Sequence, residues 1–223
     1  MSLTEHLLRG LSPSRPLITH YDDAAGTRVE LSVATVTNWA AKTANWLVEE
    51  FDVEPGDAVA VRLPAHWQTA GVLLGAWWCG AQVVSQADDA RVTFVGPGSL
   101  VSGVTAVVAL DPMGRGLASP PPDGALDYLA EARSAGDDFS PLTPISGDTP
   151  ALAGSTVDEV LARVDTVEPG ARVLSTVEWT VPDGVLHGFV SPLAAGAHLV
   201  QVSNPDPAKL ADHRRAERTT ADL

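Results

Sequence analysis

The sequence predicts an α/β fold made of two similar β-α-β units, each built around a parallel sheet. An internal repeat is the first observation behind this prediction: Val53-Glu54-Pro55-Gly56 precedes a β-prone run, Ala58 to Leu63. A near copy, Val167-Glu168-Pro169-Gly170, precedes a second such run, Arg172 to Val177. The second observation is that each run leads through a proline into an apolar helical stretch, as a buried strand followed by a packed helix would.

Both helical stretches end in a glycine and an alanine followed by another apolar run. The two sequences are Gly80-Ala81-Gln82-Val83-Val84 and Gly196-Ala197-His198-Leu199-Val200. Glycine commonly ends a helix, and a continuous Val/Leu run is typical of a strand buried on both faces of a parallel sheet. We therefore expect two parallel-sheet halves, each with the order strand, helix, strand.

The N-terminal region predicts a hairpin and a helix. Pro16 to Tyr21 and Thr27 to Leu31 are β-prone runs around the turn-forming residues Asp22-Asp23-Ala24-Ala25-Gly26. Ser32 is a favourable N-cap, so we expect an amphipathic helix from residue 33 to about residue 50. Its inward stripe at helical spacing is Val36, Trp39, Ala40, Thr43 and Leu47.

The central region predicts further alternation of helix and strand. Thr69 to Ser85 is uncharged but interrupted by glycines and shorter than the ~20 apolar residues that cross a bilayer, so we expect a buried helix running into a strand. Arg91 to Val95 and Thr105 to Leu110 are predicted strands. Asp123 to Ala135 is a predicted helix whose inward residues are Leu126, Leu129 and Ala130.

Loops and two short helices complete the chain. Asp111 to Pro122 and Gly136 to Pro150 are rich in Gly, Pro, Ser and Asp and are predicted loops. The capping-box pattern Ser155-Thr156-Val157-Asp158-Glu159 predicts the start of a short helix, and Asp206 to Arg218 predicts a terminal helix.

Composition limits the classes of partner and compartment. The chain has 223 residues, 45% of them hydrophobic, and a formal net charge of -14, so it is long enough for a packed core and would repel polyanions. Neither nucleic acid nor a membrane is an expected partner. Cys79 is the single cysteine, so neither a disulfide nor a cysteine metal cluster is expected, and we interpret it as a small buried hydrophobe. Because Met1 to His6 shows no export signal, we expect a cytoplasmic protein.

The sequence contains none of the strong catalytic motifs. It has no Gly-x4-Gly-Lys-Ser/Thr loop, no Gly-x-Ser-x-Gly elbow, no His-Glu-x-x-His and no Gly-x-Gly-x-x-Gly. Asp183 and His187 could pair on one helix face for base chemistry or metal binding, although a structural hydrogen bond is the favoured interpretation. His66, beside Trp67, lies at a strand-to-helix turn where ligands approach open parallel sheets, although an ordinary first-turn residue is favoured.

Two charged clusters are weaker candidates. Asp88-Asp89 could bind a cation, but no third acidic ligand is near in sequence, so a solvated turn is favoured and no metal site is predicted. A basic cluster on the terminal helix could meet a phosphate, and a solvated helix face explains it at least as well. Its members are His213, Arg214, Arg215 and Arg218.

Several of these segments together resemble a known family. They are Pro16-Leu17-Ile18 through the first helix, Val53-Glu54-Pro55-Gly56-Asp57-Ala58-Val59-Ala60-Val61-Arg62-Leu63-Pro64, Gly75-Ala76-Trp77-Trp78-Cys79-Gly80-Ala81, Gly170 to Thr176, and Pro192-Leu193-Ala194-Ala195-Gly196-Ala197. They resemble the start of AMP-dependent synthetases, the adenylate-forming enzymes that include acyl-CoA synthetases. The resemblance covers nearly the whole chain, as the N-terminal domain of such an enzyme. The chain is also similar to a small uncharacterised actinobacterial family.

The chain departs from this family where its chemistry lies. Family members place a Ser/Thr/Gly-rich loop ending in Pro-Lys-Gly around the ATP phosphates, after a segment like Asp148 to Leu152. Here Gly154, Ser155 and Thr156 are the vestige of that loop and the candidate cofactor-binding residues, with a helix cap as the favoured alternative. Asp158 and Glu159 follow and no lysine does, so a triphosphate would meet like charge.

In the family, a histidine is common in the segment before the helix of the second unit, and the resemblance places Val181 at that position. No catalytic residue of the family is matched in this chain. It implies one domain, 1–223, with sub-units of about 55–150 and of 16–50 plus 165–223, and no C-terminal lid.

Three functions remain open. The chain could be a non-catalytic protein that binds a nucleotide, acyl or coenzyme A-type ligand, an interaction or regulatory protein, or half of a split acyl-adenylating enzyme. No cofactor is predicted, although ATP, AMP or coenzyme A would fit the resemblance. A protein partner or a homo-oligomer is compatible with the second alternative. Fold alone does not choose among the three.

Overall fold

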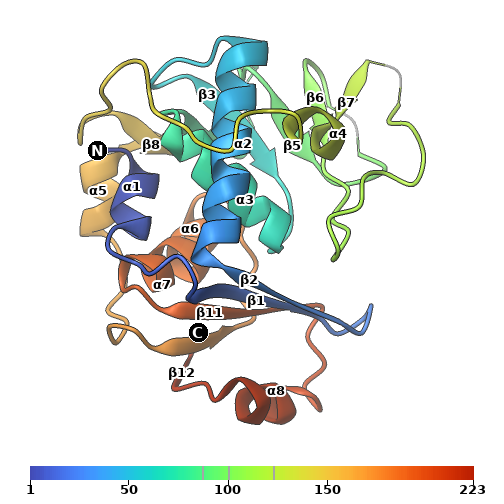
Figure 1. Cartoon of the computed structure of the whole chain (residues 1–223), viewed down its shortest axis with the longest axis vertical. Helices are drawn as coiled ribbons and strands as arrows, with labels where there is room; N and C mark the ends of the chain where they lie inside the picture. Colours follow the sequence, from blue (N-terminus) through green and yellow to red (C-terminus); the bar gives the residue numbers. More distant parts are fainter. Residues whose placement is uncertain (87, 100, 123) are drawn as a thin grey trace.

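The chain forms two sheets of mainly parallel strands with helices packed between and around them (Figure 1). The computed structural model describes residues 1–86, 88–99, 101–122 and 124–223. The predicted α/β class with two mostly parallel sheets is confirmed. Both predicted β-α-β units are present, because β3 and β4 are parallel neighbours in one sheet and β10 and β11 are parallel neighbours in the other.

The smaller sheet has five strands in the order β12-β10-β11-β1-β2. All neighbouring pairs are parallel except β1 and β2, which form the predicted hairpin. The strands are β1 (Pro16–Asp22), β2 (Thr27–Ser32), β10 (Arg172–Ser175), β11 (His198–Ser203) and β12 (Ala221–Asp222).

The larger sheet has seven strands in the order β7-β6-β5-β3-β4-β8-β9. Its pairs are parallel except for β8 and β9, which form a hairpin. The strands are β3 (Ala58–Arg62), β4 (Gln82–Val84), β5 (Thr93–Val95), β6 (Thr105–Val107), β7 (Ala125–Asp127), β8 (Pro150–Leu152) and β9 (Ser155–Thr156).

The helices vary from short turns to the long α2. They are α1 (Leu3–Leu8), α2 (Val33–Phe51), α3 (Trp67–Trp78), α4 (Tyr128–Ala132), α5 (Val157–Ala162), α6 (Asp183–Val185), the π-helix η1 (Leu186–Val190), α7 (Ser191–Ala194) and α8 (Leu210–Glu217). In the described part of the chain, no helix combines the length and the apolar character needed to span a bilayer.

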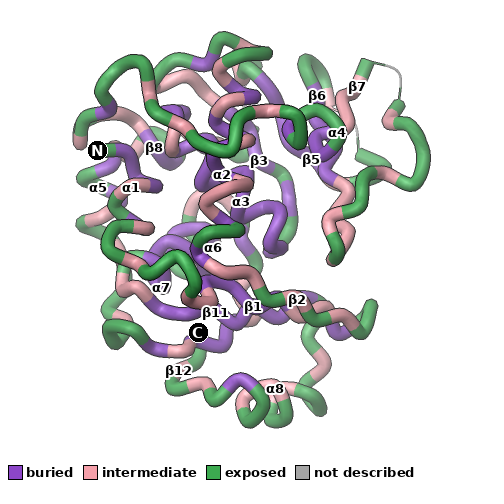
Figure 2. The backbone as a smooth tube through the Cα atoms, viewed as in Figure 1, coloured by how far each residue is buried: buried purple, intermediate pink, exposed green. Residues whose placement is uncertain are grey.

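Helices α2 and α3 form the centre of the core. The side chain of Ser32 caps α2, as predicted, and the expected inward stripe is buried except for the half-buried Trp39. A Cβ at Gly75 of α3 would lie 2.4 Å from the Cβ of Thr43 and 2.8 Å from the carbonyl oxygen of Ala40, so the two helices touch there backbone to backbone. Helix α3 is buried from Trp67 to Trp77, as the colours of Figure 2 indicate, and most of its apolar side chains share one cluster with residues of both sheets.

The helix predicted over residues 123 to 135 is partly wrong. Asp123 lies outside the described residues, and the segment from Ala125 begins as strand β7. The carboxylate of Asp127 accepts hydrogen bonds from the backbone N–H groups of Leu129 and Ala130, so it caps a helix that starts only at Tyr128. This later start leaves Ala130 exposed and Leu126 half-buried, while Tyr128 and Leu129 face inward.

Other predicted elements differ mainly at their ends. The predicted strand from Thr105 to Leu110 stops at Val107, and Leu110 has a φ of 55°, which a strand does not accommodate. The terminal helix, predicted from Asp206, starts only at Leu210 and ends at Glu217, where Arg218 with a φ of 51° is the C-cap. Helix α1 and the β8–β9 hairpin were not predicted, since six residues and two short runs carry too little periodicity.

Candidate functional site

A cleft of about 480 Å³ lies at the carboxyl ends of β3, β4 and β10, so both sheets contribute to it. Crevices outside the carboxyl ends of parallel strands are the usual place for ligands in open α/β sheets. The lining residues are Val61 and Arg62 at the end of β3, Leu63 and Pro64 after it, Ser85 and Gln86 after β4, and Glu178, Trp179, Thr180 and Val181 after β10.

The wall formed by residues 178–181 rests on two glycines of the following helices. A Cβ at Gly184 would lie 2.1 Å from the carbonyl oxygen of Glu178 and 2.7 Å from Oγ1 of Thr180. A Cβ at Gly188 would lie 3.0 Å from Cδ1 of Trp179. Because no larger residue fits at Gly184 without moving backbone, this glycine fixes how close the wall lies to α6.

The wall contains a buried polar atom without a partner. Trp179 is 2% exposed and its ring centroid lies 4.5 Å from that of Phe189. Within the described part of the chain, its indole N–H has no hydrogen-bond partner, and neither has the side-chain oxygen of the buried Gln201. The amide nitrogen of Gln201 donates to the carbonyl oxygen of Val177 at 3.2 Å, which ties β11 to the same wall. Buried polar groups are usually paired. Because the indole nitrogen is itself covered, a ligand in the cleft would reach it only if residues 178–181 moved.

The loop from β3 to α3 is held by two buried histidines. The hydroxyl of Ser203 donates to the carbonyl oxygen of Ala65 at 2.5 Å and lies 3.0 Å from Nε2 of His20, which therefore donates to Ser203. Nδ1 of His66 accepts from the backbone N–H of Gln68 at 3.1 Å, so His66 caps α3. The predicted strand-to-helix position of His66 is therefore correct, and its role there is the first-turn cap.

Both imidazoles are neutral near pH 7. Burial lowers the pKa of His20 to about 4, against smaller raising effects of Asp22 and the Ala65 carbonyl. Burial, followed by the nearby His20, lowers the pKa of His66 to about 3. The two rings lie edge to face with centroids 4.5 Å apart. Protonation of either ring would place a charge in a buried site beside a second imidazole, and burial disfavours the charged form.

The cleft carries little positive charge. Arg62 is the one cation among the residues that line it in the described ranges, and Glu178 carries an opposite charge. Both side chains are exposed, so they lie at the rim rather than in the interior. A triphosphate is bound by several cationic or N–H donors, and this lining does not supply such a clamp. One carboxylate or one phosphate would match Arg62.

The candidate phosphate-loop residues lie outside the cleft lining. Ala153 and Gly154, with φ of 46° and 89°, form the two-residue turn between β8 and β9. The side chain of Thr156 accepts from the backbone N–H of Glu159, and the Glu159 carboxylate accepts from the N–H of Thr156. Ser155 and Thr156 are half-buried in β9. In the structure these residues therefore serve a hairpin and the predicted capping box.

The expected pair of Asp183 and His187 is not formed. Nδ1 of His187 lies 2.5 Å from a carboxylate oxygen of Asp165, and Asp183 lies 3.4 Å from Arg163. The cause is local geometry, because residues 186–190 form a π-helix. A π-helix has a wider turn than an α-helix, so residues i and i+4, here Asp183 and His187, do not lie on the same face. Asp165 was missed because it lies before strand β10, 22 residues from His187 in sequence.

The remaining candidates have ordinary surroundings. Asp88 and Asp89 lie in an exposed turn, and the described residues contain no group of three or more His, Cys, Asp or Glu placed to hold a metal. In the basic cluster, His213 lies 2.8 Å from Asp23, Arg214 lies 2.9 Å from Asp222, and Arg215 pairs with Asp212. Cys79 is buried, as predicted, and burial raises the pKa of its thiol to about 12.

Comparison with solved structures shows which known proteins have a similar fold. The chain superposes over its full length, 100%, on 47% of an acyl-CoA synthetase from Brucella canis, with a TM-score of 0.79 and 14% identity. It matches an acetoacetyl-CoA synthetase from Streptomyces lividans with a TM-score of 0.73 and 21% identity, over 98% of this chain and 41% of that one. It matches the N-terminal domain of FACL13 from Mycobacterium tuberculosis with a TM-score of 0.69 and 16% identity, over 100% of this chain and 62% of that one. The chain thus has the N-terminal fold of acyl-CoA synthetases and spans about half the length of these proteins.

Sequence comparison gives a narrower assignment. No family model matches the chain. A curated protein of Mycobacterium tuberculosis, described as a TIGR03089 family protein, is 43% identical over 236 residues, which cover 98% of this chain and 95% of that protein. Identity at this level over nearly the full length of both chains shows common family membership: the chain belongs to the TIGR03089 family.

Proposed function

We propose that the protein binds a small carboxylic acid or acyl-type ligand in the cleft between the two sheets, without adenylating it. The observation that carries this proposal is the largely apolar cleft at the carboxyl ends of β3, β4 and β10, with Arg62 as the one cation among its described lining residues. The likeness to acyl-CoA synthetases adds support for an acyl ligand, at the level of fold.

The cleft suggests how such a ligand would bind. Leu63, Pro64 and Val181 offer apolar surface to a hydrocarbon chain. The guanidinium of Arg62 at the rim suits a carboxylate. The argument against adenylation is the single cation of the lining together with the structural use of Thr156, which leaves a triphosphate without a clamp.

The test is calorimetric titration of the purified chain with straight-chain carboxylic acids of increasing length, and with ATP, AMP and coenzyme A in the presence of magnesium. We expect saturable binding of acids and none of ATP. Val181→Trp should fill the cleft and abolish binding, whereas Val104→Trp, at an exposed position before β6, should leave it unchanged. Arg62→Gln should weaken acid binding about tenfold, the loss of one charge-assisted contact.

The other outcomes point to the alternative functions. Binding of ATP, together with pyrophosphate exchange by the chain and proteins that co-purify with it, would overturn the proposal in favour of a split adenylating enzyme. If none of these ligands binds, the proposal is overturned in favour of an interaction or regulatory protein.

A further inference from the structure

Strand β2 is an open edge of the five-stranded sheet. It pairs with β1 on one side, and the strand order ends with it on the other. Its residues Thr27–Ser32 contain no proline, and the side chains of Arg28 and Glu30 are 44% and 38% exposed. Among the described residues, no backbone hydrogen bond joins Thr27 to Leu31 to any segment other than β1. Figure 1 shows the β1–β2 hairpin extending from the body of the molecule.

We propose that two copies of this chain associate through β2, which pairs antiparallel with the partner's β2 about a two-fold axis. An unpaired strand edge offers a row of free N–H and C=O groups that another strand can satisfy. Because the same strand serves on both copies, the interface is closed and two-fold symmetric. The result is one continuous sheet of ten strands, five from each chain.

The pairing register follows from side-chain direction and charge. Directly opposed residues in an antiparallel pair point to the same face, so Arg28 can lie opposite only Arg28, Glu30 or Ser32 of the partner strand. Two of the symmetric registers place Arg28 against the partner's Arg28 or Glu30 against the partner's Glu30, and like charges directly opposite are destabilising. The remaining one places Arg28 against the partner's Glu30 and centres the axis on Val29.

Both faces of β2 are self-complementary in this register. On one face, Arg28 lies 2.8 Å from Glu30 of its own strand, so the two copies together form a square of alternating charges. On the other face, the half-buried Val29 meets the partner's Val29, and Thr27 meets the partner's Leu31. Cross-strand pairs of opposite charge and of β-branched residues are the ones that stabilise antiparallel sheets.

The association is expected to depend on concentration. A six-residue strand pair buries less than the roughly 1,200–2,000 Å² typical of stable interfaces. The net charge of -14 on each chain also opposes it, so measurements belong at physiological ionic strength, where the charges are screened beyond about 8 Å.

Cysteine cross-linking tests the register. Val29→Cys should form a disulfide-linked dimer under mild oxidation, because the two Val29 positions are directly opposed. Thr27→Cys alone and Leu31→Cys alone should not, since each would lie roughly 13 Å from its own copy. A mixture of these two variants should cross-link, and the natural chain, whose single Cys79 is buried, is the control.

Sedimentation velocity tests the association itself. The natural chain should shift from monomer to dimer as its concentration rises, and Glu30→Arg, which sets arginines opposite each other, should weaken dimerisation at least tenfold. Glu49→Arg makes the same charge change on the exposed face of α2 and should have no effect. The proposal is overturned by a monomer at every concentration, or by cross-linking of Thr27→Cys alone as strong as that of Val29→Cys. Neither readout depends on the cleft or its ligand.

Discussion

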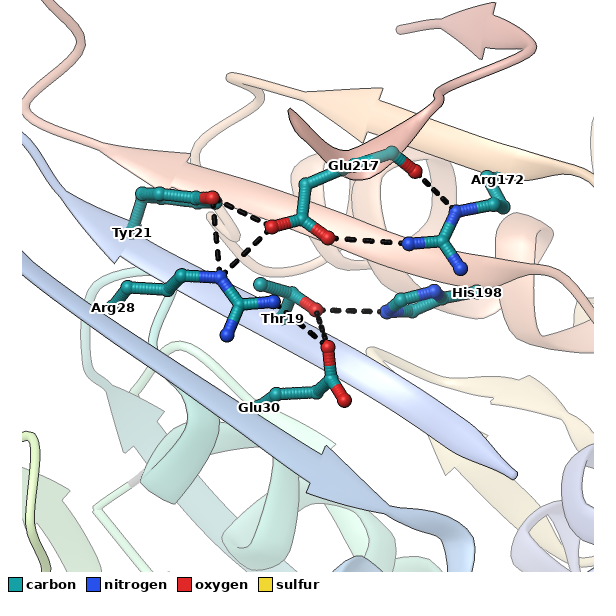
Figure 3. Close-up of polar contacts among 7 residues, drawn as sticks. All are labelled: Thr19, Tyr21, Arg28, Glu30, Arg172, His198 and Glu217. Atoms are coloured by element: carbon teal, nitrogen blue, oxygen red, sulfur yellow. Dashed lines mark hydrogen bonds and ion pairs between the residues drawn. The ribbon is translucent and has the colours of Figure 1, made fainter. Parts of the chain in front are cut away.

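Glu217 is a buried carboxylate whose charge is balanced by the strands beneath it (Figure 3). It accepts hydrogen bonds from Tyr21 at 2.6 Å, Arg28 at 2.8 Å and Arg172 at 3.1 Å. Burial by itself would raise the pKa of Glu217, but the donors Arg28 and Tyr21 and the charges of Arg28 and Arg172 outweigh it and hold the pKa below its usual value. This side chain therefore fastens α8 to β1, β2 and β10.

Glu217→Gln should lower the free energy of unfolding by about 2 kcal/mol. Removing one partner of a buried ion pair costs about 3–5 kcal/mol, and we discount that range because the side chains of Arg28 and Arg172 are 44% and 35% exposed. The measurement is urea unfolding at pH 7. Asp212→Asn is the matched control on the same helix, where the pair with Arg215 is exposed and a change within about 0.5 kcal/mol is expected. Equal losses in both variants would contradict a special role for Glu217.

The buried histidines predict acid sensitivity. The pKa of His66 is lowered to about 3, so the unfolded chain binds its proton near pH 6.5 while the folded chain does not. Stability conferred by the neutral ring is complete above pH 6.5 and falls as the pH decreases toward 3, by up to about 1.4 kcal/mol per pH unit. His66→Asn retains a good N-cap and removes the titration, so the slope of stability between pH 7 and pH 5 should decrease. An unchanged slope would refute the lowered pKa.

At the scale of elements, the cleft wall depends on α6. Gly184→Ala should destabilise the chain by about 1–3 kcal/mol, because its Cβ would overlap the carbonyl oxygen of Glu178 and force residues 178–181 to move. The checks are urea unfolding and acid binding, and both should decline. Gly96→Ala is the control, since its Cβ would have its nearest contact at 3.5 Å, from the side chain of Leu110. Tolerance of alanine at both positions would show that the wall is not fixed by Gly184.

The capping box of α5 gives a second prediction at this scale. Thr156→Ala should cost about 1 kcal/mol, since it removes the acceptor for the N–H of Glu159. Ligand binding should not change, because Thr156 is outside the residues that line the cleft. Thermal unfolding and calorimetric titration of the same variant separate the two effects. A loss of binding without a loss of stability would restore the phosphate-loop interpretation of residues 154–156.

Elements with a strong local signal could be predicted, and those set by a single contact could not. Helix α2 has a cap at Ser32 and a long stripe, so both its existence and its inward face follow from the sequence. Helix α4 has a cap at Asp127, but its five residues are too few to show a stripe. Its start is set by the Asp127 carboxylate, and the hydroxyl of Tyr128 lies 2.7 Å from that of Thr43, a contact between distant segments. No periodicity within residues 123 to 135 contains that information.

For the whole molecule, the repeat predicted two parallel-sheet halves but not the strand order. The larger sheet inserts β3 between β4 and β5 and joins β8 to β4, which depends on packing rather than on local sequence. Of the residues singled out from the sequence, His66 lies just beyond the lining segment after β3, whereas Val181 lines the cleft. The contribution of Trp179 was missed. The repeat contained the missing signal, since Pro64 and Pro182 follow equivalent strands, and equivalent segments after β3 and β10 line the cleft.

The shared core predicts that the two sheets unfold together. One cluster of buried apolar residues includes Leu199 of the smaller sheet and Phe94 of the larger, joined through α3. Leu199→Ala and Phe94→Ala should therefore each lower the single transition of the whole chain, by about 2–5 kcal/mol. Calorimetry is the measurement, and equal calorimetric and van't Hoff enthalpies are expected for the natural chain and both variants. If Leu199→Ala instead separated an early transition from an unchanged later one, the sheets would be independent units, and a ligand in the cleft would couple their stabilities rather than find them already coupled.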